Sequence, residues 1–217
     1  CPRFSLFRSF CTVIEMLTDR GYIIPEEYNY KIDEHYQDFI EWMGGEDFDI
    51  EEAHKNLQLC FEKANGAKIL TFWFLALGKN DVQTISETLI EENVKNAIVV
   101  HINKITACAG PAIKDLRVLK YFIEPFLQTE LQFNIMKHQY VPKHIICSAK
   151  KKTDVLEQYS ITKDQLPRIL SSDPICRYLG AVKGQLIKII RPSDSIPEIK
   201  IKGANKELFD VSYRIVV

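Results

Sequence analysis

The sequence has 217 residues, an apolar content of 46% and a formal net charge of −1. This apolar content is sufficient for a buried core, and the near-zero net charge by itself indicates no class of partner. No two of the six cysteines form a CxxC pair, which argues against a zinc site of the usual spacing, and we predict no metal ion and no cofactor. The longest apolar run, residues 69–77, is too short to span a bilayer, so no membrane partner is expected.

Charge is distributed unevenly along the chain. From His138 onward there are 14 Lys and Arg against 8 Asp and Glu, a net of +6, whereas the preceding part has 14 against 21, a net of −7. An acidic first part and a basic last part indicate two modules that face different surfaces. We therefore predict an N-terminal domain over residues 1–137 and a C-terminal domain over residues 138–217.

The first patterned segment is an amphipathic helix over residues 3–20, in which apolar side chains recur every three or four positions. The turn at Asp19-Arg20-Gly21 is expected to end this helix with an exposed, local ion pair. Residues 25–66 are acidic, and we predict that they form helices covering a sheet. Since the chain begins at Cys1 rather than methionine, we expect its natural start to lie upstream.

Two continuous apolar runs, residues 68–77 and 96–102, flank a segment with helical spacing at residues 82–93. A strand, a helix and a second strand in this order predict a parallel pair with a crossover helix. A loop and helix over residues 103–117 and a further strand over residues 120–126 follow. The first domain is therefore predicted to be α/β.

The second domain carries strong local signals. Thr162 and Gln165 fit a helix capping box, Asp173 precedes a proline at a first helical position, and Gly180 fits a left-handed helix end. A small α+β module with three helices beside a short sheet is expected. Its elements are a strand from Val141, helices at 148–158, 163–170 and 174–179, and strands at 185–191 and 211–217.

Several of these segments resemble one family. The motifs are VPKH at 141–144, LPRI at 166–169, DPICRYLG at 173–180, KGQLIKIIRPSD at 183–194, YRIV at 213–216 and TVIEMLTDRGY at 12–22. In this order they resemble the fifth common subunit of eukaryotic nuclear DNA-directed RNA polymerases, whose C-terminal module is also found in the archaeal polymerase.

This resemblance implies a non-catalytic subunit of a multisubunit DNA-directed RNA polymerase. Its N-terminal domain would be a restriction-endonuclease-like α/β fold without catalysis, forming part of the lower jaw that holds downstream duplex DNA. Its C-terminal module would dock on the largest subunit, with other polymerase subunits and transcription regulators as further partners. The location implied is the nucleus or, for a viral member, the site of viral transcription.

The loop and helix over residues 103–117 form the candidate nucleic-acid contact. Its small residues permit close approach of the backbone, and its cations can meet phosphate. In the resembling family the matching loop touches downstream duplex, although Ala107 occupies a position where proline is common in that family. A plain surface loop is the alternative. The residues predicted to contact nucleic acid are Lys104, Thr106, Ala107, Lys114 and Arg117.

The resemblance also implies a permanent interface with the largest subunit, and forks between arginine and carboxylate groups suit such an interface. The residues predicted to bind a partner are His144, Arg168, Asp173, Arg177, Arg191 and Arg214.

Two other functions are open. A Mg²⁺-dependent nuclease would need an Asp and an acid-x-Lys tripeptide on adjoining strands, and only Asp194 with Glu198-Ile199-Lys200 imitates this, at too short a spacing. A stand-alone adaptor that binds DNA or a regulator would show salt-sensitive duplex affinity by itself. Residues 196–209, which interrupt the family pattern, are predicted to be an inserted hairpin.

Overall fold

The computed structural model describes residues 2–192 and 209–217 and divides into two compact units, Cys1–Phe133 and Asn134–Val217, here called unit 1 and unit 2. Residues 134–137 belong to unit 2, in which the side-chain amide of Asn134 donates to the hydroxyl of Tyr178 (2.8 Å). The predicted hairpin at 196–209, apart from Phe209, and the nuclease-like residues 194–200 lie outside the described residues. Among the described helices, none combines the length and apolarity needed to cross a membrane.

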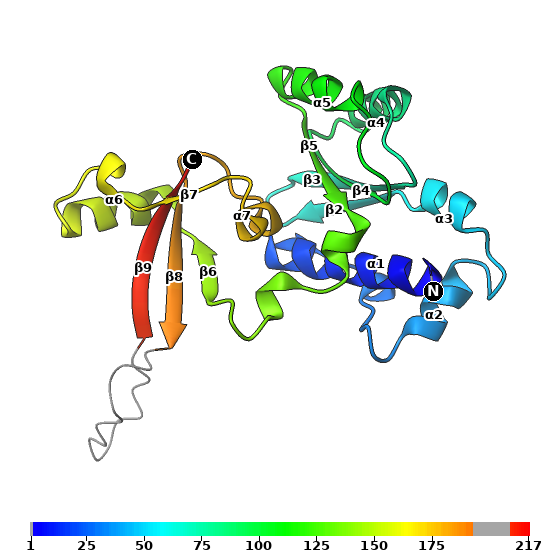
Figure 1. Cartoon of the computed structure of the whole chain (residues 1–217), viewed down its shortest axis with the longest axis horizontal. Coiled ribbons are helices and arrows are strands. Elements are labelled where there is room, and N and C mark those ends of the chain that lie inside the picture. The colour runs from blue at the N-terminus through cyan, green and yellow to red at the C-terminus, as the bar shows by residue number, and fades with distance from the viewer. Residues whose placement is uncertain (1, 193–208) are drawn as a thin grey trace, which may run out of the picture. The chain divides into compact units, whose positions relative to one another are not determined.

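Unit 1 contains a five-stranded mixed sheet with the order β1-β2-β3-β4-β5 (Figure 1). Strands β3, β4 and β5 are parallel to one another, while β1 and β2 are antiparallel to their neighbours. Its elements are α1 (Pro2–Asp19), β1 (Tyr22–Ile23), η1 (Glu26–Tyr28), α2 (Tyr36–Trp42), α3 (Ile50–Asn56), β2 (Leu59–Lys63), β3 (Lys68–Phe74), α4 (Lys79–Glu91), β4 (Asn96–His101), α5 (Ala109–Val118), β5 (Phe122–Leu127) and η2 (Gln128–Leu131).

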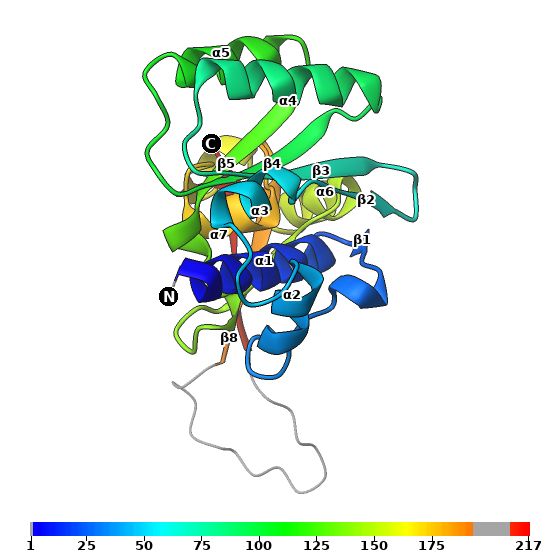
Figure 2. The same ribbon diagram turned by 90° about the vertical axis from the view of Figure 1, so that its right-hand side faces the viewer.

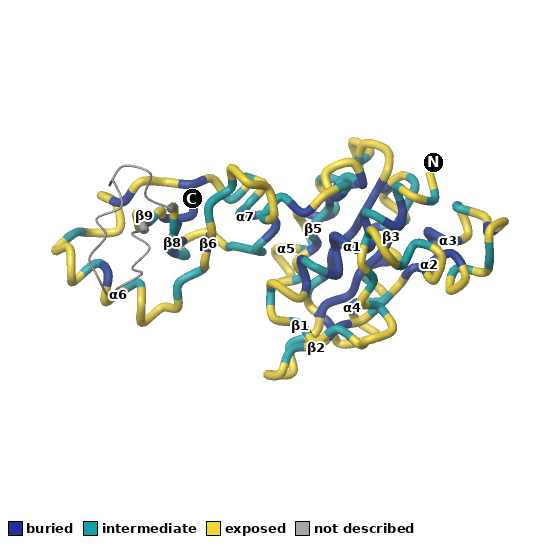
Figure 3. Tube along the Cα trace, turned by 90° about the horizontal axis from the view of Figure 1, so that it is seen from below, coloured by how far each residue is buried: buried dark blue, intermediate teal, exposed yellow. Residues whose placement is uncertain are grey.

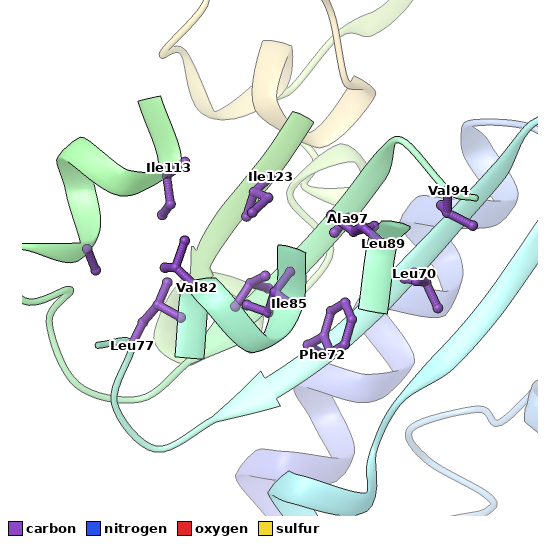
Figure 4. Close-up of a cluster of buried hydrophobic side chains, with 12 residues drawn as sticks. Leu70, Phe72, Leu77, Val82, Ile85, Leu89, Val94, Ala97, Ile113 and Ile123 are labelled. Atoms are coloured by element: carbon purple, nitrogen blue, oxygen red, sulfur yellow. The ribbon is translucent and has the colours of Figure 1, made fainter. Parts of the chain in front are cut away.

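Helices cover both faces of this sheet (Figure 2). On one face, α4 and α5 pack on alternate residues of β3 and β4, among them Leu70 and Ala97 (Figure 4). On the other face lies α1, whose Phe10 ring is 5.8 Å from that of Trp73 in β3. Much of α1 and β3 is therefore buried (Figure 3). The predicted α/β fold with a parallel pair and a crossover helix is confirmed.

The prediction that residues 25–66 are helices covering the sheet is wrong for its last part, because β2 is a strand of the sheet itself. The chain leaves α3 at Asn56 and forms β2, which pairs antiparallel with β3. Gly66 (φ +81°) supplies the left-handed backbone needed by the turn, and its N–H donates to the carbonyl of Lys63 (2.9 Å). The alternating burial of β2, with Phe61 inside, is typical of a strand that has one packed face and one exposed face.

Unit 2 has a four-stranded sheet with the order β6-β8-β9-β7. Helix α6 packs on the face that contains Leu186 and Ile215, and α7 packs on the face that contains Ile187 and Ile189. The predicted α+β class is confirmed. The elements are η3 (Ile135–Lys137), β6 (Lys143–Ile146), α6 (Ala149–Gln158), η4 (Lys163–Gln165), β7 (Arg168–Ile169), α7 (Pro174–Leu179), β8 (Leu186–Pro192) and β9 (Phe209–Val216).

The predicted helix at 163–170 is wrong, so two α-helices rather than three accompany this sheet among the residues of unit 2 that the structure describes. Only one 3₁₀ turn, η4, forms, because Pro167 disfavours helical backbone at Leu166, which is extended (φ −71°, ψ 142°). The chain then enters β7, which pairs with β9. The other local signals are confirmed: Asp173 accepts from the N–H of Ile175 (2.9 Å), and Gly180 ends α7 with left-handed backbone.

The ion pair of Arg20 differs from the exposed, local pair expected from the sequence. Arg20 follows α1 and donates from both terminal nitrogens to the carboxylate of Glu124 in β5, at 2.7 and 3.1 Å. The two side chains are 6% and 29% exposed. This two-point contact joins the first helix of unit 1 to its last strand.

Replacing Arg20 with methionine should lower the free energy of unfolding of unit 1 by about 2–3 kcal/mol, since it leaves a half-buried carboxylate without its charged partner. Both tryptophans, Trp42 and Trp73, belong to unit 1, so urea unfolding followed by tryptophan fluorescence reports this unit alone. Lys31→Met is the matched control, because it removes an exposed pair with Glu34 and should change stability by less than about 1 kcal/mol. Equal effects of the two substitutions would contradict the structural role of the Arg20 pair.

Candidate functional site

The loop after β4 lies at the carboxyl edge of the parallel strands, where α/β folds place ligand contacts. Backbone hydrogen bonds fix it to the segment that follows β3. The N–H groups of Asn103 and Thr106 donate to the carbonyls of Leu75 (2.8 Å) and Leu77 (3.1 Å). The buried His101 closes the turn, since its Nδ1 lies 2.6 Å from the carbonyl oxygen of Asn103. The loop is therefore held by the sheet rather than by its own side chains.

The predicted nucleic-acid contacts are exposed on this loop and on α5. Helix α5 turns Ala109 and Ile113 into the core, which leaves Lys114 on its outer side and Arg117 on its flank. Among the described residues, no ion pair involves Lys104, Lys114 or Arg117. We define these exposed residues, Lys104, Thr106, Ala107, Lys114 and Arg117, as the loop–α5 surface.

Sequence analysis missed Lys79, which is exposed at the start of α4. It lies two residues after Leu77, the residue that accepts the hydrogen bond from Thr106. The signal available in the sequence was the Leu77-Gly78-Lys79 step, in which glycine precedes a helix directly after an apolar strand. Together these groups can contact phosphate oxygens, which positions a duplex without reading its sequence.

In unit 2, strand register collects three of the predicted partner-binding residues on the sheet face that carries α7. His144 is paired with Ile189, while Arg214 is paired with Ile187, so both side chains point to this face. Arg191, two residues beyond Ile189, is on the same face. Asp173 begins α7, which covers part of it.

The charges of the other groups act on the buried His144. Its side chain is 8% exposed, and its Nδ1 donates to the carbonyl oxygen of Pro142 (2.6 Å). Burial lowers the pKa of His144; the Pro142 carbonyl and the charge of Asp173 oppose this shift, and the charges of Arg191 and Arg214 add to it. His144, Asp173, Arg191 and Arg214 thus form one electrostatic group, which we call the α7-face cluster.

The two remaining predicted partner-binding residues lie elsewhere in unit 2. Arg177 is half-buried in the last turn of α7. Arg168 is paired with Ile215 and therefore belongs to the opposite face, which is covered by α6. Sequence analysis missed Asp210, which is exposed and faces Arg191 across the β8–β9 ladder. Its even spacing from Arg214 along a strand could have identified it.

Within residues 2–192 and 209–217, no three His, Cys, Asp or Glu side chains gather as a metal site would require. The nuclease-like residues Asp194, Glu198 and Lys200 are not among those described.

Comparison with known proteins covers both units. Residues 4–91 match the family "RNA polymerase Rpb5, N-terminal domain", and residues 133–201 match "RNA polymerase Rpb5, C-terminal domain". The subunit RPABC1 of DNA-directed RNA polymerases I, II and III is 33% identical in Caenorhabditis briggsae and 32% identical in Caenorhabditis elegans, each over 196 residues, 88% of this chain and 91% of the relative. The protein of the same name from Dictyostelium discoideum is 30% identical over 189 residues, 85% of this chain and 88% of the relative.

An α/β unit followed by a small α+β unit, each matching one domain of the same subunit, defines a two-domain class of RNA polymerase subunit. The chain belongs to the Rpb5 family. The family predicted from the sequence motifs is confirmed.

The lowered pKa of His144 predicts a pH dependence for unit 2. Because the unfolded chain binds a proton more readily than the folded chain, the contribution is fully present above about pH 6.5 and is lost as pH falls toward the lower folded pKa. His144→Asn keeps a donor for the Pro142 carbonyl and cannot titrate, so it should flatten the stability of unit 2 between about pH 7.5 and 5.5. Urea unfolding followed by the amide signals of β8 measures this. An unchanged pH slope in the variant would contradict the assignment.

Proposed function

We propose that the chain is a non-catalytic subunit of a multisubunit DNA-directed RNA polymerase. The observation that carries this proposal is that relatives named as shared polymerase subunits match 85–88% of this chain and 88–91% of their own lengths. The match therefore includes both units rather than one borrowed module. A subunit of a nuclear polymerase acts in the nucleus, together with the other subunits of the enzyme.

In this proposal, unit 2 docks on the largest polymerase subunit through the α7-face cluster. Its support is the grouping of three potential cations, His144, Arg191 and Arg214, around one carboxylate, Asp173. Arginine forks recognise carboxylates of a permanent partner with defined geometry. Neutral His144 at pH 7 leaves the two arginines as the dominant charges. Transcription regulators are a further class of partner for exposed parts of the same unit.

Unit 1 forms part of the lower jaw and holds downstream duplex through the loop–α5 surface. Its support is the exposure of Lys104, Lys114 and Arg117 at the carboxyl edge of the sheet, on a loop whose backbone is fixed. We also propose that this unit is a restriction-endonuclease-like fold used as a scaffold without cleavage. The acid-free strand β3, at the centre of the mixed sheet, is consistent with that use.

The docking proposal predicts that Arg191→Glu and Arg214→Glu each reduce the recovery of polymerase subunits with the tagged chain at least about tenfold, since reversing a buried interfacial charge leaves its partner unpaired. The measurement is a pull-down followed by mass spectrometry. Arg168→Glu is the discriminating variant, because it makes the same charge change on the α6 side of the sheet. If only Arg168→Glu reduces recovery, docking occurs through that side instead.

A wild-type chain that recovers no polymerase subunit would contradict the proposed function as a whole. Mg²⁺-dependent cutting of DNA by the isolated chain would instead favour the nuclease.

The jaw proposal is tested in the assembled polymerase by cross-linking downstream DNA at increasing salt. Lys114→Glu together with Arg117→Glu should weaken the cross-link for every downstream sequence and lower the salt slope by about 1 for each lost phosphate contact. Lys95→Glu together with Lys120→Glu is the matched control, since both residues are exposed at the amino edge of the same sheet. Equal loss in the control would show that the effect is due to net charge rather than to the loop–α5 surface.

A further inference from the structure

A cavity of about 470 Å³ lies between α2 and α3 of unit 1, away from the residues assigned to the loop–α5 surface. Trp42, at the end of α2, is one of its lining residues. The segment between the two helices is largely exposed (Figure 3). Asp49 and Glu52, at the start of α3, line the same cavity. The cavity thus combines an aromatic residue with two acidic residues, and none of these three residues belongs to the proposed polymerase contacts.

Trp42 is held firmly and yet remains accessible. Its ring lies 5.6 Å from those of Phe10 and Tyr28 and 5.8 Å from that of Phe39, measured between centroids. Nevertheless, 42% of the residue is exposed, while the other tryptophan, Trp73, is 1% exposed. An immobilised, half-exposed indole offers contact area without further loss of side-chain entropy, and tryptophan is the best aromatic partner for a cation.

The two acids retain capacity for a ligand. One oxygen of Asp49 accepts the N-terminal N–H of α3, from Glu51 (2.9 Å), which leaves the second oxygen. Glu52 is exposed, and among the side chains that the structure describes no hydrogen bond or ion pair involves its carboxylate. Negative charge beside an indole face favours a positively charged group.

The residues around the cavity carry further negative charge. Residues 25–56 contain 11 Asp and Glu against 2 Lys, a net of −9, in a protein whose total is −1. From α1, Arg3 is the cation facing this region: its guanidinium lies 5.1 Å from the Phe48 ring centroid and donates to the Phe48 carbonyl (3.1 Å). The guanidinium of Arg3 thus contacts the Phe48 ring, and the Trp42 ring remains accessible to a ligand. The contact is also an example of a guanidinium on an aromatic residue that lines the same cavity.

We propose that this cavity binds an arginine side chain presented by a peptide segment of a partner protein. A guanidinium can stack on the Trp42 indole while its N–H fork reaches Asp49 or Glu52, whereas a lysine ammonium provides no stacking plane. The volume lies within the range of small-molecule sites and accommodates one side chain with its adjoining backbone. The inference does not depend on polymerase assembly, since every lining residue lies within residues 42–57 of unit 1.

The test uses the full chain and N-acetyl-arginine amide, with the two indole N–H signals of its NMR spectrum as the readout. Trp42→Phe assigns the signals. Titration should shift the Trp42 signal saturably and leave that of buried Trp73 unchanged. The citrulline analogue has the same shape without charge and should cause no shift, and the lysine analogue should bind at least about threefold more weakly. A citrulline shift equal to that of arginine, or preferential binding of lysine, overturns the proposal.

Charge variants locate the site. Glu52→Gln and Asp49→Asn should each weaken binding about fivefold, which corresponds to losing one charge contact; asparagine keeps the helix cap in the second variant. Glu51→Gln is the matched control, because it makes the same change on α3 at an exposed residue that does not line the cavity. It should leave the affinity within about twofold. If Glu51→Gln and Glu52→Gln weaken arginine binding equally, the ligand is attracted only by the net charge of the acidic segment, and the proposed pocket is overturned.

Discussion

Strands β3 and β4 bury side chains on both of their faces, and this constraint determines where unit 1 can carry function. Leu70 and Val99 face the helices α4 and α5, while Trp73 and its neighbours face α1. Neither of these two strands leaves an exposed face for a ligand. The two candidate sites of this unit therefore lie outside these strands, on the loop–α5 surface and in the α2–α3 region. Backbone hydrogen bonds fix the loop to the segment that follows β3, and Trp42 packs against Phe10 of α1.

The parts of the fold that the sequence predicted have signals contained within a few residues. The apolar runs of β3 and β4, the 3.6-residue period of α4 and the Asp173-Pro174 start of α7 are of this kind. The parts that it missed are set by tertiary contacts. Strand β2 is short and follows soon after a helix. Its alternation of buried and exposed residues therefore cannot be told apart from the acidic helical pattern that precedes it. The partner of Arg20 lies 104 residues away, and no local pattern contains that distance.

The candidate sites divide in the same way. The sequence identified the loop after β4 because strand ends in a parallel sheet are predictable positions. Arg168 and Arg191 were predicted to bind the same partner because both lie in one block of motifs. The register of β7 on β9, however, places the two side chains on opposite faces of the sheet. The cavity beside Trp42 was not predicted. Trp42, Asp49 and Glu52 are brought together by the segment between two short helices, and their spacing follows neither a helical nor a strand period.

The distance between Arg20 and Glu124 along the chain has a consequence for biosynthesis. Helix α1 leaves the ribosome before β5, whose Glu124 follows Arg20 by 104 residues, about 5–20 s at ordinary translation rates. Its ten buried residues, which include three large aromatic or sulfur-containing side chains, have no completed sheet to cover them during that interval. The nascent polypeptide therefore exposes these apolar side chains until the strand that carries Glu124 has been synthesised.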